Sequence, residues 1–134
     1  MEDRVIEFHL NERSGASPYQ QLVQQVRHAL RLGLLEEGDR LPTVKEVARQ
    51  VAVNPNTVLK AYRELEHEGL VAARPGVGTF VTRTLADASL AAHALLRKDL
   101  QRWLTKARLA GLDDENIEAL FVNTFRNAAG EDVA

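Results

Sequence analysis

The chain has 134 residues, which is about one domain, and it contains no cysteine. Disulfide bridges and thiolate metal sites are therefore excluded, and the composition is typical of a reducing cytosol. Its apolar runs are shorter than the ~18 residues of a membrane helix, and the N-terminus lacks the basic start and apolar core of a signal peptide. We predict a cytoplasmic protein without a membrane partner.

The net charge of −2 is unevenly distributed along the chain. Residues 13–83 carry ten Lys and Arg residues against seven acidic ones, whereas the flanking segments are acidic. Residues 40–63 hold five of these cations and a single acid, Glu46. Because salt screens charges more than ~10 Å apart, a local basic patch matters more for binding a polyanion than the total charge. The patch is consistent with a nucleic-acid partner.

The first elements are a strand and a helix. Apolar residues alternate in "RVIEFHL" from Ile6 to Leu10, which predicts a short half-buried strand. In "SPYQ", residues 17–20, Ser is a natural N-cap, Pro suits the first helical position, and Gln completes a capping box. We predict a helix over residues 18–34, with Gly38 marking the exit. Its buried stripe would contain Leu22, Val26, Ala29, Leu30 and Leu34.

Two shorter helices follow. A second capping box, in "TVKE" at residues 43–46, predicts a helix over about 43–50. The chain then turns through "VAV" and starts again, with Asn54 as N-cap and Pro55 at the first helical position. Gly69 stands where a left-handed C-cap is expected. The inner faces contain Val44, Val47, Ala48 and Val51 in the first of these helices, and Val58, Ala61, Tyr62 and Leu65 in the second.

A β-hairpin comes next, because "LVAA" and "TFVTR" are joined by the Gly-containing turn "RPGVG". Two helices separated by about three residues and followed by a hairpin give the order of a winged helix-turn-helix. We therefore predict a mainly α fold with a small β-hairpin wing. Residues 1–83 would form this domain, together with the short N-terminal strand.

Residues 84–134 are predicted to form an α-helical hairpin. A long helix over roughly 86–110 would stop at Gly111, and Asp113 or Asp114 would cap a second helix. Two helices alone bury too little apolar surface, so this unit needs the winged domain, a second copy of itself, or both. We assign a dimerisation role to its apolar residues, with Trp103 read as core or dimer contact rather than as a ligand platform. They are Leu96, Leu100, Trp103, Leu104, Ile117, Leu120, Phe121 and Phe125.

The polar start "NPNT", residues 54–57, would be an ordinary helix cap in isolation. In a helix-turn-helix, however, the second helix enters the major groove with its N-terminus first. Asn amides can bond bidentately to adenine, and Thr offers a hydroxyl and a methyl group. Free backbone N–H groups at the helix start would also favour phosphate oxygens. Lys60 and Arg63 lie one and two turns further on, in positions suited to the DNA backbone.

A family resemblance is carried by "LPTVKEVARQVAVNPNTVLKAYRELEHEGLVAARPGVGTFV", residues 41–81. This run is similar to the DNA-binding domain of GntR-family bacterial transcription regulators, and "PYQQLVQQV" extends the resemblance to about residues 10–83. The short helical tail resembles the YtrA-like subfamily. Members of that group typically repress transporter operons and dimerise through the tail.

The resemblance also implies roles by position. Lys45 occupies a basic position that commonly contacts DNA, residues 54–57 match the base-reading start of the recognition helix, and Gly76 to Gly78 match a wing tip that enters the minor groove. Two positions depart from the pattern. Many members carry Arg where Pro55 stands and a basic residue where Leu59 stands, so their operator sequence does not transfer to this chain.

We predict a homodimeric DNA-binding regulator, a repressor, on an inverted-repeat operator, without enzymatic activity, cofactor or metal. The rival interpretation is a winged-helix protein-interaction module without DNA readout, in which the polar residues only cap the helix. A ligand-gated regulator is also open, with a small effector between helices or between subunits. The residues assigned to DNA binding are Lys45, Arg49, Asn54, Pro55, Asn56, Thr57, Lys60, Arg63, Arg74, Gly76, Val77, Gly78 and Thr79.

Overall fold

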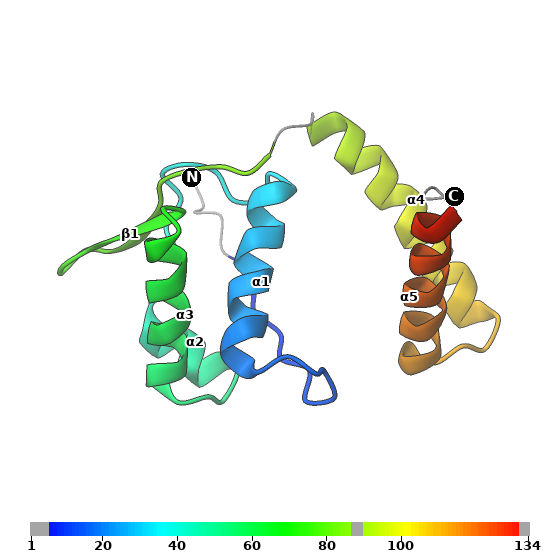
Figure 1. Ribbon diagram of the computed structural model, residues 1–134, viewed down its shortest axis with the longest axis horizontal. Coiled ribbons are helices and arrows are strands. Elements are labelled where there is room, and N and C mark those ends of the chain that lie inside the picture. Colours follow the sequence, from blue (N-terminus) through cyan, green and yellow to red (C-terminus); the bar gives the residue numbers. More distant parts are fainter. Residues whose placement is uncertain (1–5, 87–89, 132–134) are drawn as a thin grey trace. The chain divides into compact units, whose positions relative to one another are not determined.

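The computed structural model describes residues 6–86 and 90–131. The chain divides into two compact units, residues 1–90 and 91–134. The first unit holds three helices and a hairpin, and the second is built from two helices (Figure 1). The predicted fold class is confirmed. The elements are α1 (Pro18–Arg31), α2 (Val44–Gln50), α3 (Pro55–His67), β1 (Val71–Arg74), β2 (Gly78–Val81), α4 (Leu90–Leu109) and α5 (Asp114–Glu131).

Helix α1 starts as predicted and ends earlier. The Ser17 hydroxyl accepts a hydrogen bond from the Gln20 N–H, and the Gln20 side-chain oxygen accepts one from the Ser17 N–H, which completes the capping box. Gly33 has a positive φ of 73°, so the chain leaves the helix there instead of at residue 34. The assignment of Leu34 to the buried stripe was therefore wrong: Leu34 is 45% exposed, and Leu35 is buried in its place.

Helices α2 and α3 form the helix-turn-helix. The Thr43 hydroxyl accepts a hydrogen bond from the Glu46 N–H at 3.1 Å, but the return bond of a full capping box does not occur in the described residues. In the turn between the helices, Ala52 has a φ of 54°, a left-handed conformation that costs energy for any residue with a Cβ. Helix α3 then begins after Asn54, as predicted.

The core of the first unit lies among α1, α2 and α3. Helices α1 and α3 run side by side, and α2 packs against α3 (Figure 1). The Tyr62 hydroxyl donates a 2.6 Å hydrogen bond to the carbonyl of Pro42, which ties α3 to the segment before α2. Burial raises the pKa of Tyr62. The predicted stripe of α3 is confirmed, because the structure buries Val58, Ala61, Tyr62 and Leu65.

The described part of the predicted N-terminal strand, residues 6–10, is not a strand. The remaining residues of the predicted strand lie outside the described ranges. The predicted inner side is correct, since Phe8 is buried in the core. The backbone of residue 9 exchanges two hydrogen bonds with the side-chain amide of Gln25, and the backbone of residue 11 does the same with Gln21. Glutamine amides of α1 therefore take the place of a partner strand.

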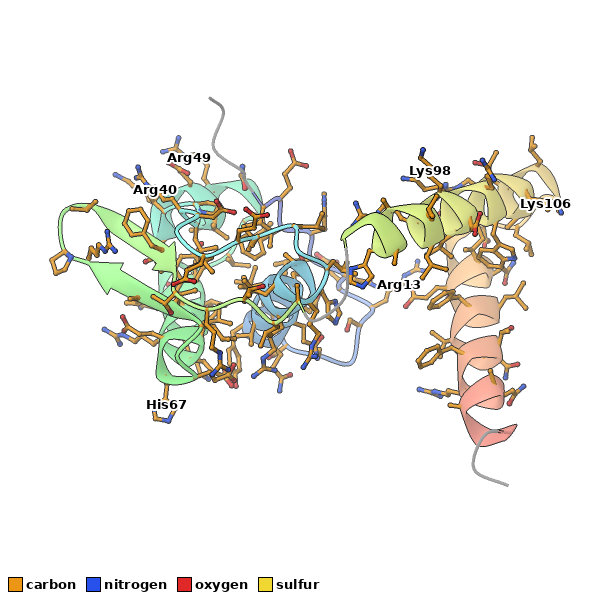
Figure 2. The ribbon with its side chains drawn as sticks, turned by 90° about the horizontal axis from the view of Figure 1, so that it is seen from above. Arg13, Arg40, Arg49, His67, Lys98 and Lys106 are labelled. Atoms are coloured by element: carbon orange, nitrogen blue, oxygen red, sulfur yellow. The ribbon has the colours of Figure 1, made fainter. Side chains whose placement is uncertain are left out.

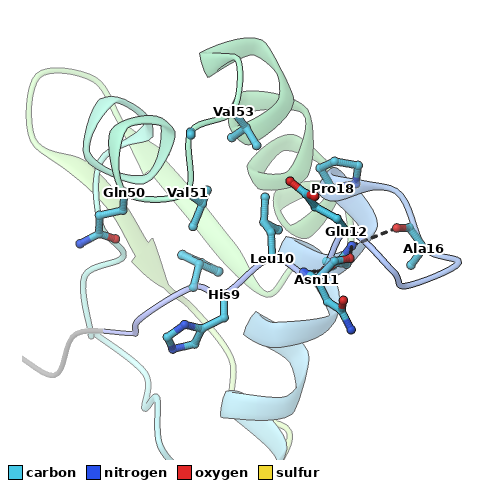
Figure 3. A pocket seen from close by; sticks show the side chains of 12 residues that line it. His9, Leu10, Asn11, Glu12, Ala16, Pro18, Gln50, Val51 and Val53 are labelled. Carbon is cyan, nitrogen blue, oxygen red and sulfur yellow. Dashed lines mark hydrogen bonds between the residues drawn. The ribbon is translucent and has the colours of Figure 1, made fainter. Parts of the chain in front are cut away.

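This segment borders an open pocket of about 670 Å³, together with the start of α1 and the α2–α3 turn (Figure 3). Leu10 faces Val51 and Val53 across it, while Asn11 and Glu12 lie near Pro18. The Gln21 amide, which also lines the pocket, donates a further 3.0 Å hydrogen bond to the carbonyl of residue 16. The polar groups of this amide are thus used to hold the N-terminal segment in place.

The wing contains more than the predicted hairpin. Strands β1 and β2 pair antiparallel, with Arg74 opposite Gly78 and Val71 opposite Val81. Residues 38–41 lie along the other edge of β2, where three backbone hydrogen bonds of 2.8–2.9 Å join the two segments. Arg40 forms an isolated antiparallel bridge with Phe80 there. The base of the wing is thereby fixed on both sides of β2.

In the second unit, α4 begins at Leu90 rather than near residue 86, which is not helical; residues 87–89 lie outside the described ranges. The chain leaves α4 before Gly111, as predicted, and the Asp113 carboxylate caps α5 by accepting a 2.8 Å hydrogen bond from the Asn116 N–H. Ala107 and Ile117 are buried in this unit. None of the described helices has the length and apolar character needed to cross a membrane.

Candidate nucleic-acid interface

The start of α3 projects polar groups into solvent. Asn54, Pro55 and Asn56 are exposed, and Thr57 is half-buried. We expected free backbone N–H groups at this helix start, and that expectation was wrong, because the N–H groups of residues 56 and 57 are already hydrogen-bonded. Pro55 has no N–H, the Asn56 N–H donates to the Asn54 side-chain oxygen at 2.8 Å, and the Thr57 N–H donates to the Asn54 carbonyl at 2.9 Å. The first helical positions therefore offer side chains, not backbone donors, to a ligand.

The two amides at this helix start have different surroundings. The side-chain oxygen of Asn54 accepts the capping hydrogen bond, so only its NH₂ group is left to bond a ligand. The Asn56 side chain makes no hydrogen bond within the described chain. A free amide offers a donor and an acceptor side by side, the pattern that pairs with adenine in the major groove. Asn56 is therefore better placed than Asn54 for bidentate base reading.

Exposed basic side chains lie on both helices of the helix-turn-helix. Lys45 and Arg49 of α2 and Arg63 of α3 are exposed, and none of them takes part in an ion pair within residues 6–86 and 90–131. The Lys60 ammonium lies 4.1 Å from the centre of the Tyr19 ring, so a cation–π contact holds this charge against the start of α1. These cations are free to meet an external anion.

The wing adds a further cation and an exposed tip. The Arg74 guanidinium lies 4.8 Å from the centre of the Phe80 ring. At the tip, Gly76 is exposed and has a positive φ, and the Val77 side chain is 56% exposed. Thr79 is half-buried, and its carbonyl accepts a 2.9 Å hydrogen bond from the Leu41 N–H. The tip thus presents a narrow, mostly uncharged edge with Arg74 at its base.

One ion pair is structural and joins α1 to the end of α3. The Arg27 guanidinium donates two hydrogen bonds to the Glu68 carboxylate, and this bonding raises the pKa of Arg27 despite partial desolvation. Both side chains are about one-third exposed, so the pair adds little stability of its own. It orients the C-terminal end of α3, which is the end remote from the polar start.

Sequence reasoning did not assign roles to Tyr19 or Arg40. Tyr19 supports Lys60 from a different helix, which no spacing pattern could indicate. Arg40 belongs to the basic patch of residues 40–63, and its charge was the available signal. Its place beside the wing depends on the pairing of residues 38–41 with β2.

A helix-turn-helix with an exposed amide at the start of its second helix, exposed cations on both helices and an adjoining wing defines a winged-helix DNA-binding protein. The model of the gntR family of bacterial regulatory proteins matches residues 18–81. The HTH-type transcriptional repressor YtrA of Bacillus subtilis (strain 168) is 33% identical over 114 residues, which span 82% of this chain and 85% of that protein.

Two solved structures are also similar. A transcriptional antiterminator from Listeria monocytogenes EGD-e shares 32% identity with a TM-score of 0.56, over 89% of this chain and 90% of that one. YtrA from Sulfolobus acidocaldarius, a GntR-family transcription factor, shares 28% identity with a TM-score of 0.53, over 73% of this chain and 97% of that one. The chain therefore belongs to the gntR family of bacterial regulatory proteins and resembles its YtrA-type members. This is a family of DNA-binding transcription regulators, not of enzymes.

Proposed function

We propose that the chain is a cytoplasmic repressor that binds, as a homodimer, an inverted-repeat operator of an adjacent transporter-type operon. The observation that carries the proposal is the helix-turn-helix itself: α3 starts with an exposed amide that makes no hydrogen bond in the described chain, and α2 and α3 carry exposed cations that lack ion-pair partners there. The similarity to the YtrA repressor of Bacillus subtilis supports repression rather than activation.

The DNA-binding roles divide between base edges and phosphates. Asn56 and Thr57 read bases in the major groove, while Pro55 and the Asn54 cap fix the angle at which the helix enters. Cationic side chains supply most of the affinity through sequence-independent phosphate contacts, and the wing tip enters the minor groove. The phosphate set is Lys45, Arg49, Lys60, Arg63 and Arg74, and the tip consists of Gly76, Val77, Gly78 and Thr79.

The second unit holds the dimer. Leu95 and Leu96 on α4 and Phe125 on α5 are 65–67% exposed, which is a large apolar surface for two helices. An apolar groove of about 370 Å³ lies between Trp103 of α4 and the α5 residues Leu120, Phe121, Thr124, Phe125 and Ala128. We propose that a second copy of this unit occupies the groove. Leu100 and Leu104, which do not line the groove, would make further contacts with that copy. Ile117 is 6% exposed and so contributes to the hairpin itself rather than to the partner surface.

Dimer geometry and gating follow from this arrangement. Recognition helices on one face of a two-fold dimer reach successive major grooves about 34–36 Å apart, which requires half-sites one helical turn apart. A small effector, if the regulator is ligand-gated, would bind at the tail groove between helices or between subunits. Such binding would couple to DNA affinity through the dimer.

The test is fluorescence-anisotropy binding of the full chain to labelled DNA from upstream of its own gene, with a scrambled duplex of equal composition as control, over a salt series. We expect a strong preference for the upstream DNA and a steep linear fall of log K with log salt concentration. Equal affinity for both duplexes would refute sequence-specific regulation at this site. A dimer that binds neither duplex would favour the protein-interaction alternative.

A further inference from the structure

One face of the wing gathers two arginines and an aromatic ring. Cross-strand partners in an antiparallel pair share a face, so Arg74 lies on the same face as its partner Gly78, and so does Phe80, two residues further along β2. Arg40 bridges to Phe80 from the opposite edge of β2, which brings Arg40 to this face as well. The core lies on the other face, where Leu41 and Val81 are buried.

Both guanidinium groups reach over the central strand. From the β1 edge, the Arg74 guanidinium lies 4.8 Å from the centre of the Phe80 ring. From the other edge, the Arg40 side chain occupies the space above Gly78: a Cβ atom at position 78 would lie 3.0 Å from the Arg40 Nε and 3.6 Å from its Cζ. Gly78 therefore leaves room for the Arg40 side chain, because a Cβ there would require it to shift by a few tenths of an ångström.

Two acidic side chains of neighbouring segments bond backbone donors rather than these arginines. The Asp39 carboxylate accepts a 2.8 Å hydrogen bond from the Glu36 N–H, and the Glu66 carboxylate accepts one of 2.8 Å from the Ala73 N–H. Across the described ranges, neither Arg40 nor Arg74 forms an ion pair. Two guanidinium groups without an ion-pair partner on one small face repel each other, and an anion between or beside them would relieve that repulsion.

We propose that Arg40 is a phosphate-binding residue, and that Arg40 and Arg74 grip the DNA backbone from one face of the wing. The proposal rests on the DNA-binding function proposed above and adds a contact that the recognition-helix argument does not require. Guanidinium groups bond phosphate oxygens through paired N–H donors, which suits two arginines preorganised on a rigid sheet. Arg40 and Arg49 project from the same edge of the unit, whereas His67 lies at the opposite edge (Figure 2). A backbone path past Arg49 would therefore continue to Arg40.

The experiment compares Arg40→Ala and Arg40→Lys with the wild-type chain, using anisotropy on the upstream and scrambled duplexes over a salt series. The matched control is Arg31→Ala, which removes the same charge from the last turn of α1. We expect Arg40→Ala to weaken binding roughly tenfold on both duplexes. The slope of log K against log salt concentration should become shallower by about 0.9 for each wing that loses a phosphate contact. Arg40→Lys should fall between wild type and Arg40→Ala, because it keeps the charge but not the paired donors.

A double-mutant cycle tests the role of Gly78. Gly78→Ala strains the backbone, where φ is 144°, in either background, but it crowds the guanidinium at position 40 only when Arg40 is present. We expect Gly78→Ala to weaken binding by a larger factor in the wild-type background than in Arg40→Ala. Additive effects would overturn the contact between the two positions.

The failure of this inference can be told apart from that of the proposed function. If the wild-type chain binds DNA with a steep salt slope and Arg40→Ala keeps that slope or matches Arg31→Ala, Arg40 is not a phosphate contact and the inference alone is overturned. If the wild-type chain binds neither duplex, the proposed function fails and the inference fails with it. Circular dichroism of each variant establishes that the exposed substitutions leave the helices intact.

Discussion

Replacing Asn56 by alanine removes an amide that makes no hydrogen bond within the described chain and stands exposed at the start of α3. No fold contact is lost, so the free energy of unfolding should change by less than about 0.5 kcal/mol. A bidentate amide–adenine contact is worth about 1–3 kcal/mol of discrimination. Since about 1.4 kcal/mol corresponds to a tenfold change, affinity for the operator should fall roughly 5- to 150-fold per half-site contact, with little change on scrambled DNA.

Asn54 provides the contrasting case, because its oxygen caps α3 through a 2.8 Å bond from the Asn56 N–H. Asn54→Ala removes this cap and should lower the free energy of unfolding by about 1 kcal/mol, within a range of roughly 0.5–2 kcal/mol. Asn54→Ser keeps an oxygen acceptor at the N-cap and should recover most of that loss. The amide NH₂ group of Asn54 is absent from both variants, so the comparison tests the cap acceptor.

Two assays separate these effects. Urea unfolding followed by circular dichroism gives the stability, and anisotropy on operator and scrambled duplexes gives the specificity. Equal losses on both duplexes for Asn56→Ala would refute base reading by that residue. If Asn54→Ser is as unstable as Asn54→Ala, or if it loses specificity as strongly as Asn56→Ala, the division of roles between the two amides is wrong.

Three further variants test other parts of the molecule. Lys60→Ala should weaken binding to all sequences and lower the salt slope by about 0.9 per contact, with the exposed Lys98→Ala as control, and an unchanged slope would count against a phosphate contact. Trp103→Ala should shift the chain toward monomer in sedimentation velocity at micromolar concentration. Leu109→Ala, which lies outside the apolar groove of the second unit, should not. A Trp103→Ala chain that stays dimeric would contradict the proposed dimer surface. Ala52→Gly should raise the free energy of unfolding by up to about 1 kcal/mol, because it relieves a left-handed alanine at φ 54°, and a loss of stability in urea unfolding would refute this.

The helices of the first unit were predictable because their ends are marked locally. A Ser-Pro start and an Asn-Pro start each place an N-cap and a first helical residue within two positions, and the structure confirms both. Boundaries without such a mark were less accurate. The predicted end of α1 lies too far along the chain because leucines continue past Gly33. Hydrophobic periodicity alone does not show where the backbone adopts a positive φ, as it does at Gly33.

The N-terminal strand and the third wing segment could not be assigned correctly for a different reason. An alternating pattern indicates an extended chain with one buried side. The buried side is right for residues 6–10, but the pattern does not identify the hydrogen-bond partner. That partner is a pair of glutamine amides one helical turn apart on α1, Gln21 and Gln25. Residues 38–41 are too short to show a period, and they become part of the wing only through pairing with β2.

The same limit applies to the candidate site, where residue types were predictable and their supports were not. The basic patch indicated which cations could meet a phosphate, but three of the contacts that position them cross between elements. Lys60 of α3 rests on Tyr19 of α1, Arg74 of β1 rests on Phe80 of β2, and Arg40 lies over Gly78. Each contact restricts a long flexible side chain before DNA arrives, which lowers the entropy lost on binding. Affinity for DNA should therefore depend on the packing of α1 and the wing as well as on the charges themselves.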